Sequence, residues 1–136
     1  MLIKEGEVQS SNERIVYPTI TSCLTVTCIF TGPRFVGGHC VKVPTRGQLG
    51  YQAVVQEIKN KSPDQGRVYV YFVGAIPYWN AAEKSCMYQT LQADEPIDID
   101  TTPFNAVDVE FLPTGFVNLL KAGTHQILYQ RTFGQR

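Results

Sequence analysis

The chain has 136 residues, of which 43% are hydrophobic and 18% are charged. This composition is typical of one globular domain, which we place at residues 1–136. Because 12 basic and 12 acidic side chains cancel, net charge gives no reason to expect nucleic acid or an anionic membrane as a partner. No apolar run approaches the length of a membrane span, and residues 1–13 lack the apolar core of a signal peptide.

Hydrophobic periodicity predicts strands and helices along the whole chain. Residues 24–31 place alternate side chains on opposite faces, and Gly32-Pro33 separates them from an antiparallel partner. Residues 67–75 are apolar on both faces, which is typical of an interior strand. In chain order we expect an extended segment at 14–20, strands at 24–31 and 35–43, a helix at 48–61, a strand at 67–75, a helix at 79–92, an acidic loop at 93–103, a strand at 107–112, a helical turn near 116–122 and a strand at 125–131. These elements predict an α+β fold, a layered, sandwich-like mixed or antiparallel sheet of five or six strands with two or three flanking helices.

The cysteines do not form a pattern that binds metal. The chain contains no CxxC pair and no tight His/Cys cluster, so we expect no metal site and no cofactor. A domain of this size does not need disulfides, and we expect reduced thiols. Three of the four cysteines are then small core hydrophobes: Cys28, Cys40 and Cys86.

The fourth cysteine, Cys23, lies at the open end of the predicted hairpin together with a histidine. Cys23 ends the string Ile20-Thr21-Ser22-Cys23, and Gly37-Gly38-His39 follows on the partner strand. A thiol beside an imidazole makes a nucleophile and its base, and we expect this pair to hold a thiolate at neutral pH. The alternative interpretation is that Cys23 is a buried core residue and that His39 is a structural histidine.

The register of the hairpin decides whether the two side chains meet. A regular hairpin with Gly32-Pro33 at its centre places His39 opposite Val26, about 10 Å along the strand from Cys23 and on the other face. We therefore predict a bulge at Gly37-Gly38, or a bend at residues 21–23, that corrects the register.

These segments resemble the superfamily of glutamine deamidases that contains CheD and the catalytic domains of the cytotoxic necrotizing factors. Ile20-Thr21-Ser22-Cys23 is similar in type to the Leu-Ser-Gly-Cys string of the toxins, and Gly37-Gly38-His39 resembles the glycine pair that precedes the histidine strand in CheD. The resemblance covers roughly residues 17–44. It implies a protein-glutamine deamidase with Cys23 as nucleophile and His39 as base. We expect a monomer that acts on a protein substrate.

Members of this superfamily orient the histidine with a threonine hydroxyl or with a backbone carbonyl. Where the threonine stands in those that use one, this chain has Tyr17. We expect the main-chain carbonyl of Tyr17 to orient His39, with the hydroxyl of Thr19 or Thr21 as the alternative. For substrate binding we expect Ser22, Gly37 and Gly38, with the N–H of Cys23 as an oxyanion donor.

The sequence leaves several alternative functions open. An amine that intercepts the thioester would make the protein a transglutaminase, and a thiol peptidase would use the same pair of residues. His125 is an alternative base. The non-enzymatic alternative is a binding domain without catalytic activity. The resemblance implies either a housekeeping enzyme of the bacterial cytoplasm or a toxin-like effector carried into a host cytosol by a dedicated secretion system.

Overall fold

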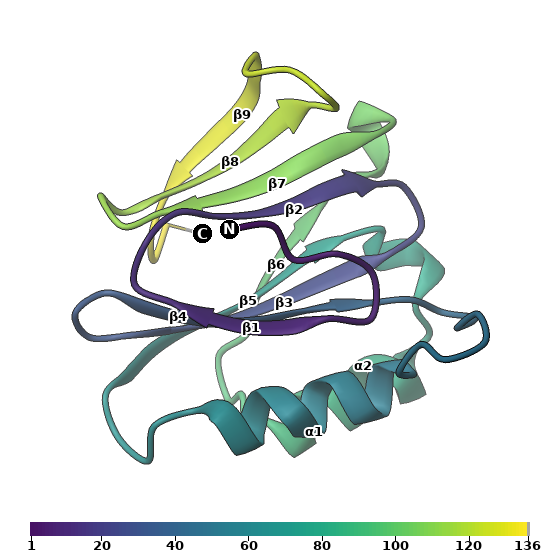
Figure 1. Ribbon diagram of the computed structural model, residues 1–136, viewed down its shortest axis with the longest axis vertical. Coiled ribbons are helices and arrows are strands. Elements are labelled where there is room, and N and C mark those ends of the chain that lie inside the picture. The colour runs from purple at the N-terminus through teal and green to yellow at the C-terminus, as the bar shows by residue number, and fades with distance from the viewer. Residues whose placement is uncertain (136) are drawn as a thin grey trace.

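Two β-sheets stack face to face, and two helices cover the outer face of one of them (Figure 1). This computed structural model describes residues 1–135 and confirms the layered α+β fold. The five-stranded sheet has the order β1-β4-β3-β5-β6, formed by Val8–Ser11, Arg34–Cys40, Leu24–Phe30, Arg67–Gly74 and Ile97–Asp100. The four-stranded sheet has the order β2-β7-β8-β9, formed by Ile15–Ile20, Val107–Leu112, Phe116–Lys121 and Ile127–Thr132. The helices are α1 (Tyr51–Lys61) and α2 (Ala81–Thr90), with short 3-10 turns at η1 (Ile76–Tyr78) and η2 (Thr102–Phe104).

The alternation of side chains in β3 separates two cores. All seven residues of β3 are buried. Leu24, Val26 and Cys28 face the helices, whereas Cys23 and Ile29 face the other sheet. Cys23 therefore belongs to the layer between the sheets, although it lies one residue before the strand begins.

Both helices carry local signals for their positions. In α1, Val54, Val55 and Ile58 form the buried face. The α2 helix begins with a capping box, in which the side chains of Asn80 and Glu83 each accept a hydrogen bond from the other residue's backbone N–H. Such a cap contributes about 1 kcal/mol to helix stability.

Two predictions about the elements were wrong, and one strand was missed. Residues 116–122 form strand β8 rather than a helical turn, because Val117 and Leu119 enter the core between the sheets. The acidic loop contains strand β6, whose Ile97 and Ile99 enter the same core while β6 pairs parallel with β5. Strand β1 was not predicted; its four residues are all half-buried. The other elements occur where expected with shifted ends, and β5 is an interior strand as predicted.

The N-terminal strap, residues 1–7, connects the two sheets at one edge. The Ile3 N–H donates to the Val16 carbonyl of β2 at 2.8 Å, and the Gly6 N–H donates to the His39 carbonyl of β4 at 2.9 Å. The strap turns at Gly6, whose φ of +76° lies in the region that favours glycine. Glu5 lies at this turn, which the Glu7 N–H closes by donating to the Lys4 carbonyl at 3.0 Å.

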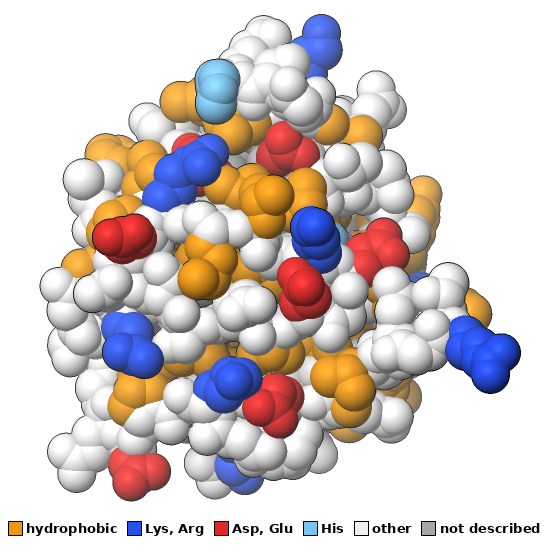
Figure 2. Space-filling view, viewed as in Figure 1, with side chains coloured by type: hydrophobic (Ala, Val, Ile, Leu, Met, Phe, Trp, Pro, Cys, Tyr) orange, Lys and Arg blue, Asp and Glu red, His pale blue; other side chains and the backbone are white. Residues whose placement is uncertain are grey.

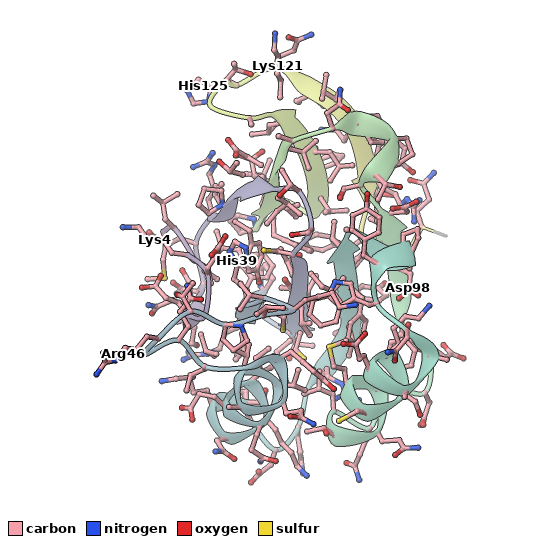
Figure 3. The ribbon with its side chains drawn as sticks, turned by 90° about the vertical axis from the view of Figure 1, so that its right-hand side faces the viewer. Lys4, His39, Arg46, Asp98, Lys121 and His125 are labelled. Carbon is pink, nitrogen blue, oxygen red and sulfur yellow. The ribbon has the colours of Figure 1, made fainter. Side chains whose placement is uncertain are left out.

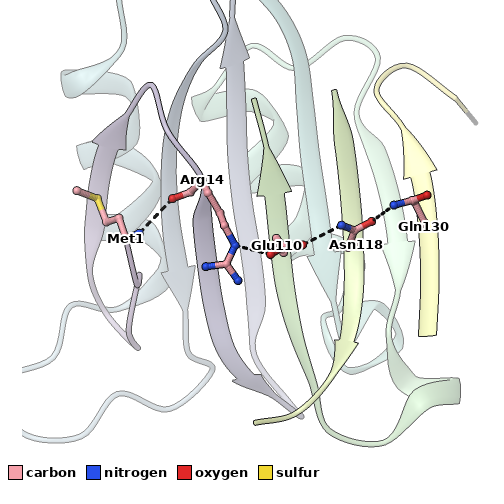
Figure 4. Close-up of polar contacts among 5 residues, drawn as sticks. All are labelled: Met1, Arg14, Glu110, Asn118 and Gln130. Carbon is pink, nitrogen blue, oxygen red and sulfur yellow. Dashed lines mark hydrogen bonds and ion pairs between the residues drawn. The ribbon is translucent and has the colours of Figure 1, made fainter. Parts of the chain in front are cut away.

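A row of polar contacts crosses the four-stranded sheet (Figure 4). Glu110 pairs with Arg14 and accepts a hydrogen bond from Asn118 at 2.8 Å, and Asn118 accepts one from Gln130 at 2.8 Å. The amino group of Met1 donates to the Arg14 carbonyl at 3.1 Å. The row therefore also fixes the start of the strap.

The surface carries charges of both signs, interspersed on the face shown in Figure 2. Within residues 1–135, neither helix combines the length and the apolar character that crossing a bilayer requires.

Candidate functional site

Cys23 and His39 lie on the same face of the five-stranded sheet, but the predicted register was wrong. Thr25, not Val26, is opposite His39, because Gly32 alone is the centre of the turn and Phe30 pairs with Arg34. A shift of one residue moves every side chain of a strand to the other face. Cys23, two residues before Thr25, is therefore the diagonal neighbour of His39 on the face between the sheets. Cys23 is 6% exposed and His39 is 1% exposed.

The predicted bulge at Gly37-Gly38 does not occur, and these glycines serve packing instead. Both pair in regular register with β3 and with β1. A Cβ at Gly37 would overlap the Tyr17 hydroxyl, and a Cβ at Gly38 would lie 2.5 Å from Val54 Cγ1 in α1. Because both glycines are buried against these neighbours, the structure gives them no surface for substrate.

The carbonyl of Ile3, in the strap, orients the imidazole of His39. His39 Nδ1 donates to this carbonyl at 2.9 Å, so we assign the proton of the neutral ring to Nδ1. His39 Nε2 then carries a free lone pair. This atom is buried and has no hydrogen-bond partner among residues 1–135.

The prediction that the Tyr17 carbonyl orients His39 was wrong, because His39 Nδ1 donates to the Ile3 carbonyl instead. The main chain of Tyr17 lies opposite Val109 in the β2–β7 ladder. Its side chain nevertheless supports the site. The Tyr17 hydroxyl lies 2.6 Å from Thr27 Oγ1, and its ring stands edge-on to the His39 ring with centroids 6.0 Å apart. Thr19 and Thr21 are exposed, and the Thr19 N–H donates to Asp108.

Glu5 is the third side chain at the site, and no pattern of residues indicated it. Cys23 Sγ donates to Glu5 Oε1 at 3.8 Å. One donor atom each from Glu5, Cys23 and His39 lie within 4.8 Å of one another. Figure 3 shows His39 between the layers, near Lys4 of the strap, whereas His125 lies at the far end of the molecule. His125 is therefore not placed to act on Cys23.

Burial keeps both members of the pair neutral at neutral pH, and at Cys23 the charge of Glu5 acts in the same direction. Burial, followed by the Glu5 charge and hydrogen bond, raises the pKa of Cys23 to about 11. Burial also lowers the pKa of His39, although the Ile3 carbonyl and the charges of Glu5 and Glu7 oppose this shift. The predicted thiolate is thus wrong for the resting protein, which holds a thiol beside a neutral imidazole.

Two hydrogen bonds to backbone carbonyls hold the segment that carries Cys23 in place. The Cys23 carbonyl accepts a hydrogen bond from the Ala75 N–H at 3.0 Å, and Trp79 Nε1 donates to the Ser22 carbonyl at 3.3 Å. Trp79 itself is buried. The side chains of Thr21 and Ser22 are exposed on the other side. Ser22 therefore remains placed where a substrate could contact it.

The remaining cysteines do not contribute to the site. All four thiols are free; Cys28 and Cys40 are buried in the core beneath the helices, and Cys86 is half-buried in α2. Four surface hollows lie elsewhere, three beside Arg67 and Gln92 and one beside Phe104, and neither Cys23 nor His39 lines any of these four. Cys23 is buried, and its Sγ contacts the carboxylate of Glu5.

No protein-family model matches the chain, and no curated protein matches its sequence.

Proposed function

We propose that the protein is a cysteine-dependent hydrolase that converts glutamine side chains of a protein substrate to glutamate and ammonia. The observation that carries this proposal is the proximity of Cys23 and His39, whose donor atoms lie within 4.8 Å of each other, together with the hydrogen bond of His39 Nδ1 to the Ile3 carbonyl. Nucleophile, base and orienting group are thus all present. The resemblance of the segments around Cys23 and His39 to the deamidases adds support, since some members of that superfamily use a backbone carbonyl in this role.

The neutral resting pair defines the order of proton transfers. His39 Nε2 takes the proton of the Cys23 thiol while sulfur attacks the carbon of the glutamine amide. The oxyanion accepts hydrogen bonds from backbone N–H groups, among which we propose that of Cys23. The C–N bond then breaks, His39 gives its proton to the departing ammonia, and a thioester remains. Water, deprotonated by His39, hydrolyses the thioester and restores the thiol.

Because Cys23 is buried, the substrate that we propose is a glutamine side chain that projects from the surface of a protein. The exposed Thr21 and Ser22 precede the thiol in the chain, and the side chain of Glu5 lies on an exposed turn of the strap. A glutamine side chain that projects from a partner protein can displace Glu5 and reach Cys23. We propose a monomer that acts either in the bacterial cytoplasm, as a chemoreceptor-type deamidase, or in a host cytosol, as an effector.

The proposal is tested by incubating the protein with dimethylated casein and measuring released ammonia and glutamine-to-glutamate conversion in tryptic peptides. We expect both in the wild type and in Cys86→Ser, which changes a thiol outside the site, and neither in Cys23→Ser. Equal ammonia release by Cys23→Ser would refute the role of Cys23. Incorporation of an added primary amine in place of glutamate would identify a transglutaminase.

A further inference from the structure

Glu5, Cys23 and His39 bring together three kinds of metal ligand from separate segments of the chain. Their carboxylate, thiol and imidazole donor atoms lie within 4.8 Å of one another. These are the donor types of protein zinc sites, with bonds of about 2.0–2.3 Å. In a tetrahedral site such bonds place the donors roughly 3.4–3.6 Å apart, so binding requires the three side chains to approach by about 1 Å. Glu5 is exposed on the turn of the strap and can make this movement.

The histidine is already arranged as a metal ligand. Histidines that bind metals usually donate their other ring N–H to a carbonyl or a carboxylate, which fixes the tautomer and the ring. His39 Nδ1 makes such a bond to the Ile3 carbonyl, and Nε2 is buried without a partner among the described residues. A buried acceptor without a partner is unfavourable, and a bound cation at this lone pair would remove that cost.

Charge and ligand softness select the kind of ion. A thiolate ligand favours zinc over magnesium or calcium, which prefer oxygen ligands. The two anionic ligands, Cys23 and Glu5, balance the charge of a divalent ion, so a complex with neutral His39 has no net charge to bury. The exposed Glu5 also lies at the surface, where an ion enters.

We propose that Glu5, Cys23 and His39 form a binding site for Zn²⁺, with a fourth position left for water. Binding forms a bond from the Cys23 sulfur to the metal and releases the thiol proton to solvent. The metal-bound sulfur is then unavailable as a nucleophile. The zinc site is independent of the proposed deamidase activity, whereas inhibition of turnover by Zn²⁺ rests on it.

The site is tested first with Co²⁺ as a spectroscopic substitute for Zn²⁺, added to the reduced full chain without oxygen. We expect one equivalent to produce a thiolate-to-cobalt charge-transfer band and the visible bands of a tetrahedral ion, both removed by Zn²⁺. Cys23→Ser should abolish the charge-transfer band, and Glu5→Gln should weaken Co²⁺ binding at least tenfold, as the loss of a direct ligand should exceed the loss of a supporting contact. The controls Glu13→Gln, Cys86→Ser and His125→Asn should bind like the wild type, and circular dichroism checks the fold of each variant.

A second measurement follows the thiol directly and needs no enzymatic activity. Zn²⁺ should protect Cys23 from iodoacetamide in the wild type, and a chelator should restore its labelling. The proposal is overturned by a wild type without the thiolate band, by a band that persists in Cys23→Ser, or by Co²⁺ affinity that Glu5→Gln leaves unchanged. A cobalt band in a protein that releases no ammonia would retain the zinc site and refute the deamidase.

Discussion

The substitution Glu5→Gln tests how the strap controls the reactivity of Cys23. The Sγ of Cys23 lies 3.8 Å from the Glu5 carboxylate. At this separation two charges interact by about 1 kcal/mol in water and by about 4 kcal/mol at a protein surface of lower polarity. Because Glu5 is exposed, we take the lower value, which corresponds to roughly 0.8 pKa unit. The pKa of Cys23, about 11 in the wild type, should therefore fall by nearly one unit.

The expected change in labelling rate is smaller than the change in ionisation. Well below the pKa, a fall of roughly 0.8 unit raises the thiolate fraction about sixfold. A thiolate of lower pKa is also a weaker nucleophile, with a Brønsted coefficient of about 0.4–0.5, which reduces the gain to about threefold. Iodoacetamide labelling between pH 7 and 9, with a chelator present and the labelled peptides mapped, measures this rate. The exposed Glu13→Gln should have no effect, and a Glu5→Gln protein labelled at Cys23 no faster than the wild type would refute the reasoning.

Three further predictions concern the histidine and its surroundings. Gly38→Ala should lower the free energy of unfolding by about 1–3 kcal/mol in urea denaturation, because the new Cβ would lie 2.5 Å from Val54 Cγ1 in α1; an unchanged midpoint would contradict the packing role. Burial lowers the pKa of His39 below 6.5, although the Ile3 carbonyl and the charges of Glu5 and Glu7 oppose this shift. The unfolded state therefore binds the proton first, and the stability that His39 contributes should be complete above pH 6.5 and decline as the pH falls below it. His39→Gln should flatten this part of the stability curve, and an equally steep curve would assign the decline to other groups. Thr19→Val and Thr21→Val should each keep most of the ammonia release, because the Ile3 carbonyl orients His39; a loss of about a hundredfold, the size of a general-base contribution, would return that role to a threonine.

The sequence predicted the parts of the fold that depend on side-chain periodicity. Alternation in residues 24–30 and the glycine turn after them predicted the β3–β4 hairpin, and the apolar run from Arg67 predicted an interior strand. It did not predict β8, since four successive buried residues from Val117 to Leu120 show no simple alternation. Strand β6 is short, and its isoleucines become informative only once β5 supplies a partner.

At the site, the sequence identified the two side chains and missed what surrounds them. Cys23 and His39 are reactive residue types at the open end of one hairpin, so their proximity was predicted. The structure brings them together through the pairing of Thr25 with His39 rather than through the predicted bulge at Gly37-Gly38. The group that orients His39 is the backbone carbonyl of Ile3. Because every residue has a backbone carbonyl, no pattern of residue types indicates it. Glu5 is one exposed acid among many, and it meets Cys23 only because the strap turns at Gly6. The neutral state of the pair also follows from burial, which is a property of the folded chain.

Capture of the thioester is the most direct test of the central claim that Cys23 attacks a glutamine amide. Hydroxylamine added during the reaction with dimethylated casein should intercept the thioester and leave glutamyl hydroxamates on the substrate. The account predicts hydroxamate formation at the sites that otherwise become glutamate, at the expense of glutamate, and none with Cys23→Ser or His39→Ala. Hydroxamate formed equally by Cys23→Ser, or glutamate formed by the wild type with no hydroxamate at any hydroxylamine concentration, would contradict it.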